Sequence, residues 1–262
     1  MLYNWYTLRI MYYLILGVKI NSTYFNMSEL YKKIYFLCDK EKELIRYNFL
    51  IKQIENINLQ NYEFFNYIWG TDITDTIRKE YCKSDYTMQF HGRNMITNPL
   101  SNGEISLFLN YIECLRKIRK EYTEGIFITM ESDVIFGNDF NKNLMELLNS
   151  INLLNKEWDI INIGNTKPWF ENNKQYRNNP IIINTIKFYK EKRNRCTEGI
   201  IWNYQSVCKF LDYFDEKKDI DGPIDTKMDV LSEYLERFNI YWNEPTFITQ
   251  GSICNIFKTS LR

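Results

Sequence analysis

An acidic triplet, Glu131-Ser132-Asp133, comes directly after the largely apolar run 125–130 (GIFITM). Such a run predicts a strand that is buried on both faces of a parallel sheet, and the core then fixes the turn that follows it. Carboxylate oxygens are ligands that Mg²⁺ and Mn²⁺ prefer, and a divalent cation stabilises the charge that develops on a departing diphosphate. The triplet by itself is equally compatible with a solvated turn or a helix cap. A metal site and a plain turn are therefore the two hypotheses at this point.

A capped helix and a second buried strand flank the triplet in the sequence. Ser101 and Glu104 have the S-x-x-E spacing of a capping box, in which each side chain accepts a hydrogen bond from a free backbone N–H. Segment 158–163 (WDIINI) predicts another buried strand, and acids or glycine follow both strands, at the carboxyl ends where ligands bind in open α/β sheets. A helix is expected over 102–120 because apolar residues recur there at helical spacing: Ile105, Phe108, Leu109, Ile112, Leu115 and Ile118.

The rest of the chain alternates between short apolar runs and amphipathic stretches. Two segments, 69–98 and 166–180, show no period, and the first is predicted to be a long loop with one helical turn. Long loops on such scaffolds often bind substrate, so Trp169 and Phe170 in the second segment are candidate acceptor contacts. The other predicted elements are strands at 33–38, 62–65, 181–189, 199–202 and 247–249, and helices at 44–54, 139–154, 204–214 and 226–238.

The length and composition suit one globular α/β domain. The chain has 262 residues, 45% hydrophobic and 25% charged, which is enough apolar material for a sizeable core. We expect an N-terminal appendage over residues 1–30 and a single domain over 31–262. The apolar run 10–18 is far shorter than the roughly 20 residues that cross a bilayer, so no transmembrane segment is expected. A cytoplasmic location is the prediction, and this short run leaves membrane association or secretion open as the alternative.

Charge and cysteine usage argue against two classes of partner. Lys+Arg and Asp+Glu both total 33, so no net basic field gathers nucleic acid, whose binding depends on neutralising phosphates. The six cysteines are scattered without a C-x-x-C pair and His91 is the only histidine, which argues against a Cys/His zinc site. Free thiols in a reducing compartment are expected instead. For His91, a structural or solvated side chain is expected rather than a metal ligand or base.

Several segments occur in the order of one known family. The runs LSNGEISLFLNYIECLRKIRK (100–120), GIFITMESDVIF (125–136) and WDIINIGN (158–165) resemble motifs of family 25 glycosyltransferases, which include bacterial lipopolysaccharide β-galactosyltransferases and procollagen galactosyltransferases. The resemblance spans residues 33–257 and implies a glycosyltransferase A-type, Rossmann-like α/β fold, with a mixed, mostly parallel sheet and helices on both faces. Further similar elements are Gly199-Ile200-Ile201, Pro223-Ile224-Asp225, and IYFLCD (34–39) followed by Arg46.

The resemblance also implies a reaction and roles for individual residues. The reaction is inverting transfer of a hexose, galactose or glucose, from a UDP-sugar to a hydroxyl on a glycan or a hydroxylated side chain of a glycoprotein, with Mn²⁺ or Mg²⁺ as cofactor. An inverting transferase needs a general base, usually a carboxylate. The implied roles are Asp133 and Glu131 as metal ligands, Glu131, Asp39, Arg46 and Glu104 as donor-binding residues, and Asp225, or secondly Asp221, as the base.

Each implied role has a structural alternative, and the chain departs from the family pattern. Glu104 is explained by its capping box, Asp39 and Asp225 could cap helices, and Arg46 could be a surface charge. A family member that binds nucleotide or glycan without turnover is a second hypothesis, and a phosphoryl-transfer enzyme is a third, although the chain has no P-loop. The departures are Ser132 for the middle acid, Cys38 for an Asn, Asn110-Tyr111 for Ser-His, and Trp69-Gly70 for Asp-Gly.

Overall fold

The structure is a computed structural model of the chain. It describes residues 30–83, 87–90, 93–96, 100–154, 156–164, 179–191, 197–233, 235 and 237–258. The predicted appendage lies outside these residues except for Leu30, and so do Trp169, Phe170 and His91. None of the helices in the described ranges is long and apolar enough to cross a membrane.

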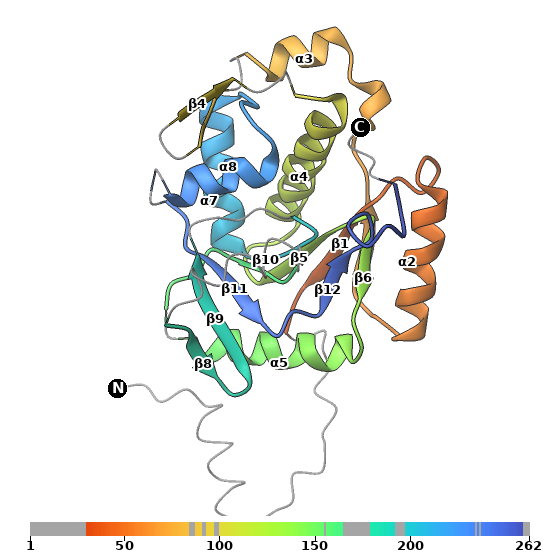
Figure 1. Ribbon diagram of the computed structural model, residues 1–262, viewed down its shortest axis with the longest axis vertical. Helices are drawn as coiled ribbons and strands as arrows, with labels where there is room; N and C mark the ends of the chain where they lie inside the picture. Colours follow the sequence, from red (N-terminus) through yellow and green to blue (C-terminus); the bar gives the residue numbers. More distant parts are fainter. Residues whose placement is uncertain are drawn as a thin grey trace, which may run out of the picture.

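An eight-stranded sheet forms the centre of the molecule (Figure 1). Its order is β2-β1-β5-β10-β7-β11-β9-β8. Six strands run in one direction, namely β2, β1, β5, β7, β11 and β8, and two strands, β10 and β9, run in the other. The predicted mixed, mostly parallel sheet is therefore confirmed. The strands are β1 Lys33–Leu37, β2 Tyr62–Phe65, β5 Ile126–Glu131, β7 Ile160–Asn162, β8 Ile181–Ile183, β9 Ile186–Glu191, β10 Gly199–Asn203 and β11 Ile240–Glu244.

Helices cover both faces of this sheet, as Figure 1 shows. One apolar cluster joins α4, α7 and α8 to the sheet, and the other joins α2 and α5 to its opposite face. Tyr35, Phe127 and Trp202 belong to the first cluster, whereas their sequence neighbours Ile34 and Ile128 belong to the second. Successive strand residues point to opposite faces, which explains the unbroken apolar runs. The helices are α2 Leu44–Asn56, α4 Asn102–Glu121, α5 Phe140–Leu153, α7 Tyr204–Lys217 and α8 Ile224–Glu233.

Helix α4 begins with the predicted capping box. The Glu104 N–H donates to Ser101 Oγ at 3.2 Å, and the Ser101 N–H donates to Glu104 Oε2 at 2.7 Å. These bonds satisfy two backbone donors that the first turn would otherwise leave open, an arrangement that stabilises a helix by about 1 kcal/mol. The helix then buries its predicted apolar face between the sheet and α7. The capping box therefore fixes where α4 begins beside the ends of the central strands.

Two sequence predictions about elements were wrong, and the bounds of a third element differ. Segment 69–98 is more regular than a loop, because Thr74 caps a helix by accepting a hydrogen bond from the Ile77 N–H. The predicted strand 181–189 is the hairpin β8–β9, since Asn184 takes a left-handed conformation with φ 54° and turns the chain. The helix predicted at 226–238 is α8, shifted toward the N-terminus. The elements within 69–98 are η2 Gly70–Asp72, α3 Asp75–Tyr81, β3 Thr87–Phe90 and β4 Arg93–Ile96.

A second, two-stranded sheet carries the C-terminal segment back to the centre. Strand β6 (Val134–Phe136), directly after the acidic triplet, pairs antiparallel with β12 (Ile248–Gln250). The register places Gln250 opposite Val134. Residues near the end of the chain therefore lie beside the triplet, although more than a hundred positions separate them in sequence.

Candidate functional site

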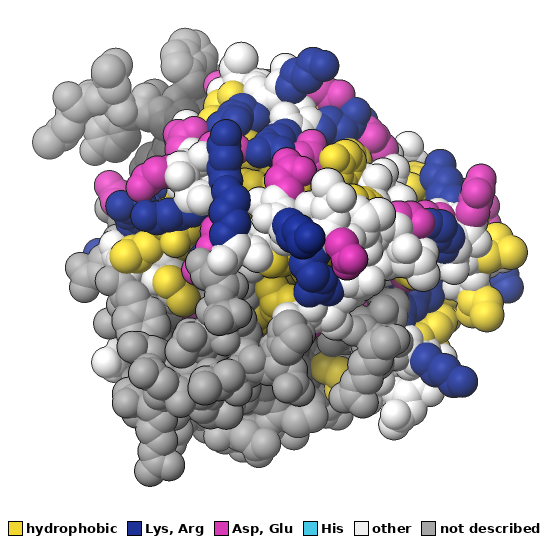
Figure 2. Space-filling model, turned by 90° about the horizontal axis from the view of Figure 1, so that it is seen from above, with side chains coloured by type: hydrophobic (Ala, Val, Ile, Leu, Met, Phe, Trp, Pro, Cys, Tyr) yellow, Lys and Arg dark blue, Asp and Glu magenta, His cyan; other side chains and the backbone are white. Residues whose placement is uncertain are grey.

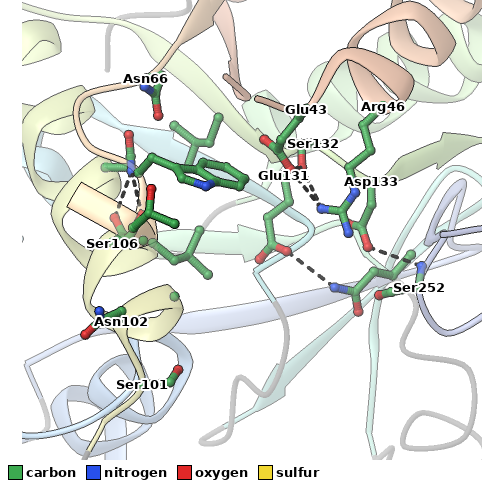
Figure 3. Close-up of a pocket in the computed structure, with 18 residues that line it drawn as sticks. Glu43, Arg46, Asn66, Ser101, Asn102, Ser106, Glu131, Ser132, Asp133 and Ser252 are labelled. Atoms are coloured by element: carbon green, nitrogen blue, oxygen red, sulfur yellow. Dashed lines mark hydrogen bonds and ion pairs between the residues drawn. The ribbon is translucent and has the colours of Figure 1, made fainter. Parts of the chain in front are cut away.

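The carboxyl ends of three parallel strands meet at one edge of the sheet. Leu37 at the end of β1 is in register with Phe65 on β2 and with Glu131 on β5. A cavity of about 430 Å³ opens at this edge, and the whole acidic triplet lines it. Figure 3 shows Glu131, Ser132 and Asp133 together on one side of this cavity. This is the edge at which the order of elements predicted a ligand site.

Asp133 is held by the C-terminal turn and keeps one carboxylate oxygen uncommitted. Its side chain is buried, with 2% of the residue exposed. The Ser252 N–H donates to Asp133 Oδ2 at 3.2 Å, and the Gly251 N–H donates to the Asp133 carbonyl at 2.7 Å. Oδ1 has no hydrogen-bond partner among the residues that the structure describes. A buried carboxylate oxygen is costly to leave unsatisfied, so its position suits a cation or another ligand in the cavity.

The pKa of the Glu131 carboxyl is strongly raised. Burial, and then the neighbouring carboxylates of Asp133, Glu198 and Asp225, raise the pKa of Glu131 to about 8, although a hydrogen bond from Thr197 opposes the rise. The Thr197 hydroxyl donates to Oε1, and the Gln250 amide donates to Oε2 at 3.3 Å. A neighbouring cation would favour the charged form of Glu131. Glu131 is therefore placed either to bind a cation or to hold a proton.

The middle residue of the triplet belongs to a buried polar cluster. Ser132 Oγ donates to Glu43 Oε1 at 2.6 Å, and Arg46 Nη1 donates to Ser132 Oγ at 2.9 Å and to Glu43 Oε1 at 3.0 Å. Burial raises the pKa of the Glu43 carboxyl, while Ser132 and Arg46 act in the opposite direction. Arg46 also donates to the Lys258 carbonyl. This cluster joins α2, the triplet and the C-terminal turn.

Helix α4 and the loop after β2 form the opposite side of the cavity. The Asn110 side chain fixes the backbone of this loop through two hydrogen bonds. Its Oδ1 accepts from the Tyr67 N–H at 2.6 Å, and its Nδ2 donates to the Ile68 carbonyl at 2.7 Å. The next residue, Tyr111, donates to the Thr197 carbonyl at 2.6 Å. Since Thr197 in turn binds Glu131, helix α4 positions both sides of the cavity.

Most of the chain matches one known protein family. The model described as glycosyltransferase family 25 (LPS biosynthesis protein) matches residues 34–228, which is well over half of the sequence. The chain belongs to glycosyltransferase family 25. It is therefore a glycosyltransferase, as the motifs of the sequence predicted. A search of curated proteins gives no match.

Part of the site lies outside the region that matches family 25. It includes the acidic triplet and α4, but β11, β12 and the turn after them lie beyond residue 228. Gln250 and Ser252, which contact Glu131 and Asp133, therefore come from outside the matched region. The sequence motifs did not predict these two residues, nor Glu43 and Glu198. For Glu43 a signal existed, because Glu43 and Arg46 have the i, i+3 spacing of a helical ion pair.

The structure separates the predicted site residues of this family 25 chain into two groups. Arg46, Glu131 and Asp133 line the same cavity. Arg46 is buried, so the alternative of a surface charge is wrong. Asp39 and Glu104 do not line the cavity; Asp39 Oδ1 accepts the N–H groups of residues 41 and 42 at 2.9 Å, as a turn cap does, and Glu104 completes the capping box.

The two candidate bases, Asp225 and Asp221, also lie off the cavity wall. Asp225 is in the first turn of α8 and accepts the Thr226 N–H at 2.7 Å. Its charge contributes to the raised pKa of Glu131, so the two carboxylates interact electrostatically. The side chain of Asp221 is 45% exposed and forms an ion pair with Lys227. Asp225 is thus the candidate whose charge reaches the centre of the site.

The donor atoms suit a cation that a substrate helps to bind. Across the described ranges, no group of three or more His, Cys, Asp and Glu side chains is arranged to hold a metal ion. Asp133 with Glu131 would supply one or two carboxylates, and phosphate and water oxygens would fill the other positions. Mg²⁺ commonly binds to proteins in this way, so the residues present fit a divalent cation that arrives with a diphosphate.

Proposed function

We propose that this glycosyltransferase transfers a hexose, galactose or glucose, from a UDP-sugar to a hydroxyl on a glycan or a hydroxylated side chain, with inversion and with Mn²⁺ or Mg²⁺. The observation that carries the proposal is the buried Oδ1 of Asp133, which lies at the carboxyl edge of the sheet beside Glu131 and has no hydrogen-bond partner within the described part of the chain. Transfer of this kind breaks the bond between the anomeric carbon and a diphosphate oxygen. Negative charge grows on that diphosphate, so stabilisation is needed at the leaving group.

Asp133 and Glu131 would hold the cation. When bound, a divalent ion supplies positive charge to the diphosphate. The hydrogen bonds from Ser252 and Gln250 keep the two carboxylates oriented before substrate arrives, which avoids the cost of ordering them during the reaction. The buried Glu43–Arg46 pair holds the turn between them.

Asp225 is the proposed general base. Inversion requires the acceptor hydroxyl to attack the anomeric carbon from the side opposite the diphosphate, while its proton moves to a carboxylate. Asp225 supports this role better than Asp221, because Asp225 interacts with Glu131 whereas Asp221 is paired with Lys227. Asp225→Asn is expected to lower kcat by at least about a hundredfold, the usual contribution of general base catalysis, with donor affinity nearly unchanged.

The test is release of UDP from UDP-galactose and UDP-glucose, with and without Mn²⁺, across a panel of glycan and hydroxylysine-peptide acceptors. We expect metal-dependent release that Asp133→Ala abolishes. Asp212→Ala is the matched control, because Asp212 is an acid on the outer surface, with 76% of its side chain exposed. Binding of UDP without release from any donor would support the alternative of a member that binds without turnover. Absence of both would overturn the proposal.

A further inference from the structure

The two sides of the cavity differ in chemistry. Figure 3 shows Glu131, Asp133 and Arg46 on one side and Asn66 and Asn102 on the other. The second side carries neutral groups, namely Asn66, Trp69, Thr71, Asn102, Ser106 and Leu107. Figure 2 shows acidic and basic side chains interspersed over the described part of the face that is seen from above. Charged and neutral side chains are therefore separated inside the cavity, whereas opposite charges are mixed on the outer face in Figure 2.

Trp69 is the large aromatic side chain of the neutral side, and its loop is fixed. Asn110 accepts a hydrogen bond from the Tyr67 N–H and donates one to the Ile68 carbonyl. The Ser106 hydroxyl donates to that same carbonyl at 2.9 Å. The Trp69 carbonyl accepts the Asp72 N–H at 2.9 Å. Gly70 lies so close to α4 that an added Cβ would be 3.4 Å from the Gly103 nitrogen. The indole is therefore mounted on a loop that needs little ordering when a ligand binds.

We propose that the Trp69 indole stacks on the nucleobase of the nucleotide-sugar donor. The proposal rests on the function proposed above, which places the diphosphate beside Glu131 and Asp133. A nucleotide sugar has its base and its transferred sugar at opposite ends of that diphosphate, so the two ends must occupy different parts of the site. Stacking on an aromatic ring is a recurrent way to bind a base, because every base presents a π-face.

The neutral side suits the base rather than the sugar. Glu131 interacts with the carboxylates of Glu198 and Asp225, so the acidic groups that could activate an acceptor gather around the triplet. The transferred sugar must lie where the acceptor and its base can reach it. Asn66 and Asn102 line the cavity with Trp69. Asn66 Nδ2 donates to Asp39 Oδ2 at 3.0 Å, and Asn102 Oδ1 accepts from Arg78. The other polar atom of each amide, Asn66 Oδ1 and Asn102 Nδ2, can form a hydrogen bond with the polar edge of a base. Trp69 and these amides therefore form the nucleobase site.

The experiment compares three ligands on three proteins by isothermal titration calorimetry with Mn²⁺ present. The ligands are UDP, ribose 5-phosphate and inorganic pyrophosphate, and the proteins are the unmodified chain, Trp69→Ala and Trp69→Phe. We expect Trp69→Ala to weaken UDP binding by about tenfold or more, as loss of one base–aromatic stack does. Trp69→Phe keeps a ring and should lose less than about threefold. Affinity for the two ligands without a base should be the same in all three proteins.

The outcomes separate this proposal from the function on which it rests. If the unmodified chain binds UDP and Trp69→Ala binds it equally well, the stacking proposal is overturned and the donor site stands. A parallel loss of UDP and pyrophosphate in Trp69→Ala would also overturn it, because the effect would then be on the shape of the cavity. If the unmodified chain binds no nucleotide, both proposals fail. Circular dichroism of each variant shows whether it is folded.

Discussion

Ser132 donates a 2.6 Å hydrogen bond to the buried carboxylate of Glu43, which lies 89 positions earlier in the chain. In this buried cluster the carboxylate is that of Glu43, the residue before α2, and the triplet contributes the hydroxyl of its middle residue, Ser132. Arg46 contacts both side chains, so the cluster has one negative and one positive charge. A second carboxylate at position 132 would leave an excess negative charge in a buried place.

Replacement of Ser132 by Asp is therefore expected to destabilise the protein by about 3 kcal/mol, the cost of an uncompensated buried charge. Ser132→Ala removes one hydrogen-bonding hydroxyl and should cost about 1 kcal/mol. Adding Glu43→Gln to Ser132→Asp should recover most of the loss, because one carboxylate is again present beside Arg46. Urea unfolding at pH 7 measures all three differences. Equal stability of Ser132→Asp and the unmodified chain would contradict this account of the cluster.

Arg46→Ala should also destabilise the protein, by about 3 kcal/mol, because it leaves the carboxylate of Glu43 buried without its cation. The exposed side-chain fractions of this pair are 10% for Arg46 and 6% for Glu43. Lys217→Ala is the control, since Lys217 and Glu216 form an exposed pair, with 54% and 61% exposed, and such pairs contribute less than about 1 kcal/mol. A similar small loss in both variants, measured by urea unfolding, would show that the buried pair contributes little.

Stability without metal should fall as pH rises from 5 to 8. The pKa of Glu131 is raised from 4.5 to about 8 in the folded protein, so the folded state binds this proton more tightly than the unfolded state does. The free energy of unfolding then decreases with pH between those two values, by no more than about 1.4 kcal/mol per pH unit. Glu131→Gln should flatten this dependence, and Glu216→Gln should not. Unfolding in EDTA across this range tests it; identical slopes for Glu131→Gln and the unmodified chain would refute the assignment.

The sequence predicted those elements whose signals are local. The capping box of Ser101 and Glu104 predicted the start of α4, and the apolar run before Glu131 predicted β5. Short elements were harder, because α3 depends on the Thr74 cap and the β8–β9 hairpin depends on the left-handed Asn184 within an isoleucine-rich run. These signals extend over one or two residues and have no period.

The site was predictable only where a motif carried it. Asp133 and Glu131 follow a buried strand, so their position at the sheet edge could be inferred from order alone. Contacts from Glu43, Thr197 and Gln250 depend on folding, since these residues are 89, 66 and 119 positions away from their partners in the triplet. No spacing in the sequence encodes such contacts. Glu104 shows the converse, because its capping box is local. Asp39 combines a local cap with a hydrogen bond from Asn66, which lies 27 positions away.

The most direct test of the central claim is a crystal structure of the protein with UDP and Mn²⁺, with anomalous scattering used to locate the manganese. The account predicts a manganese peak at the Asp133 carboxylate, with the diphosphate of UDP bound beside it at the same edge of the sheet. UDP bound at this edge with no metal at Asp133, or metal and UDP bound elsewhere on the molecule, would contradict it.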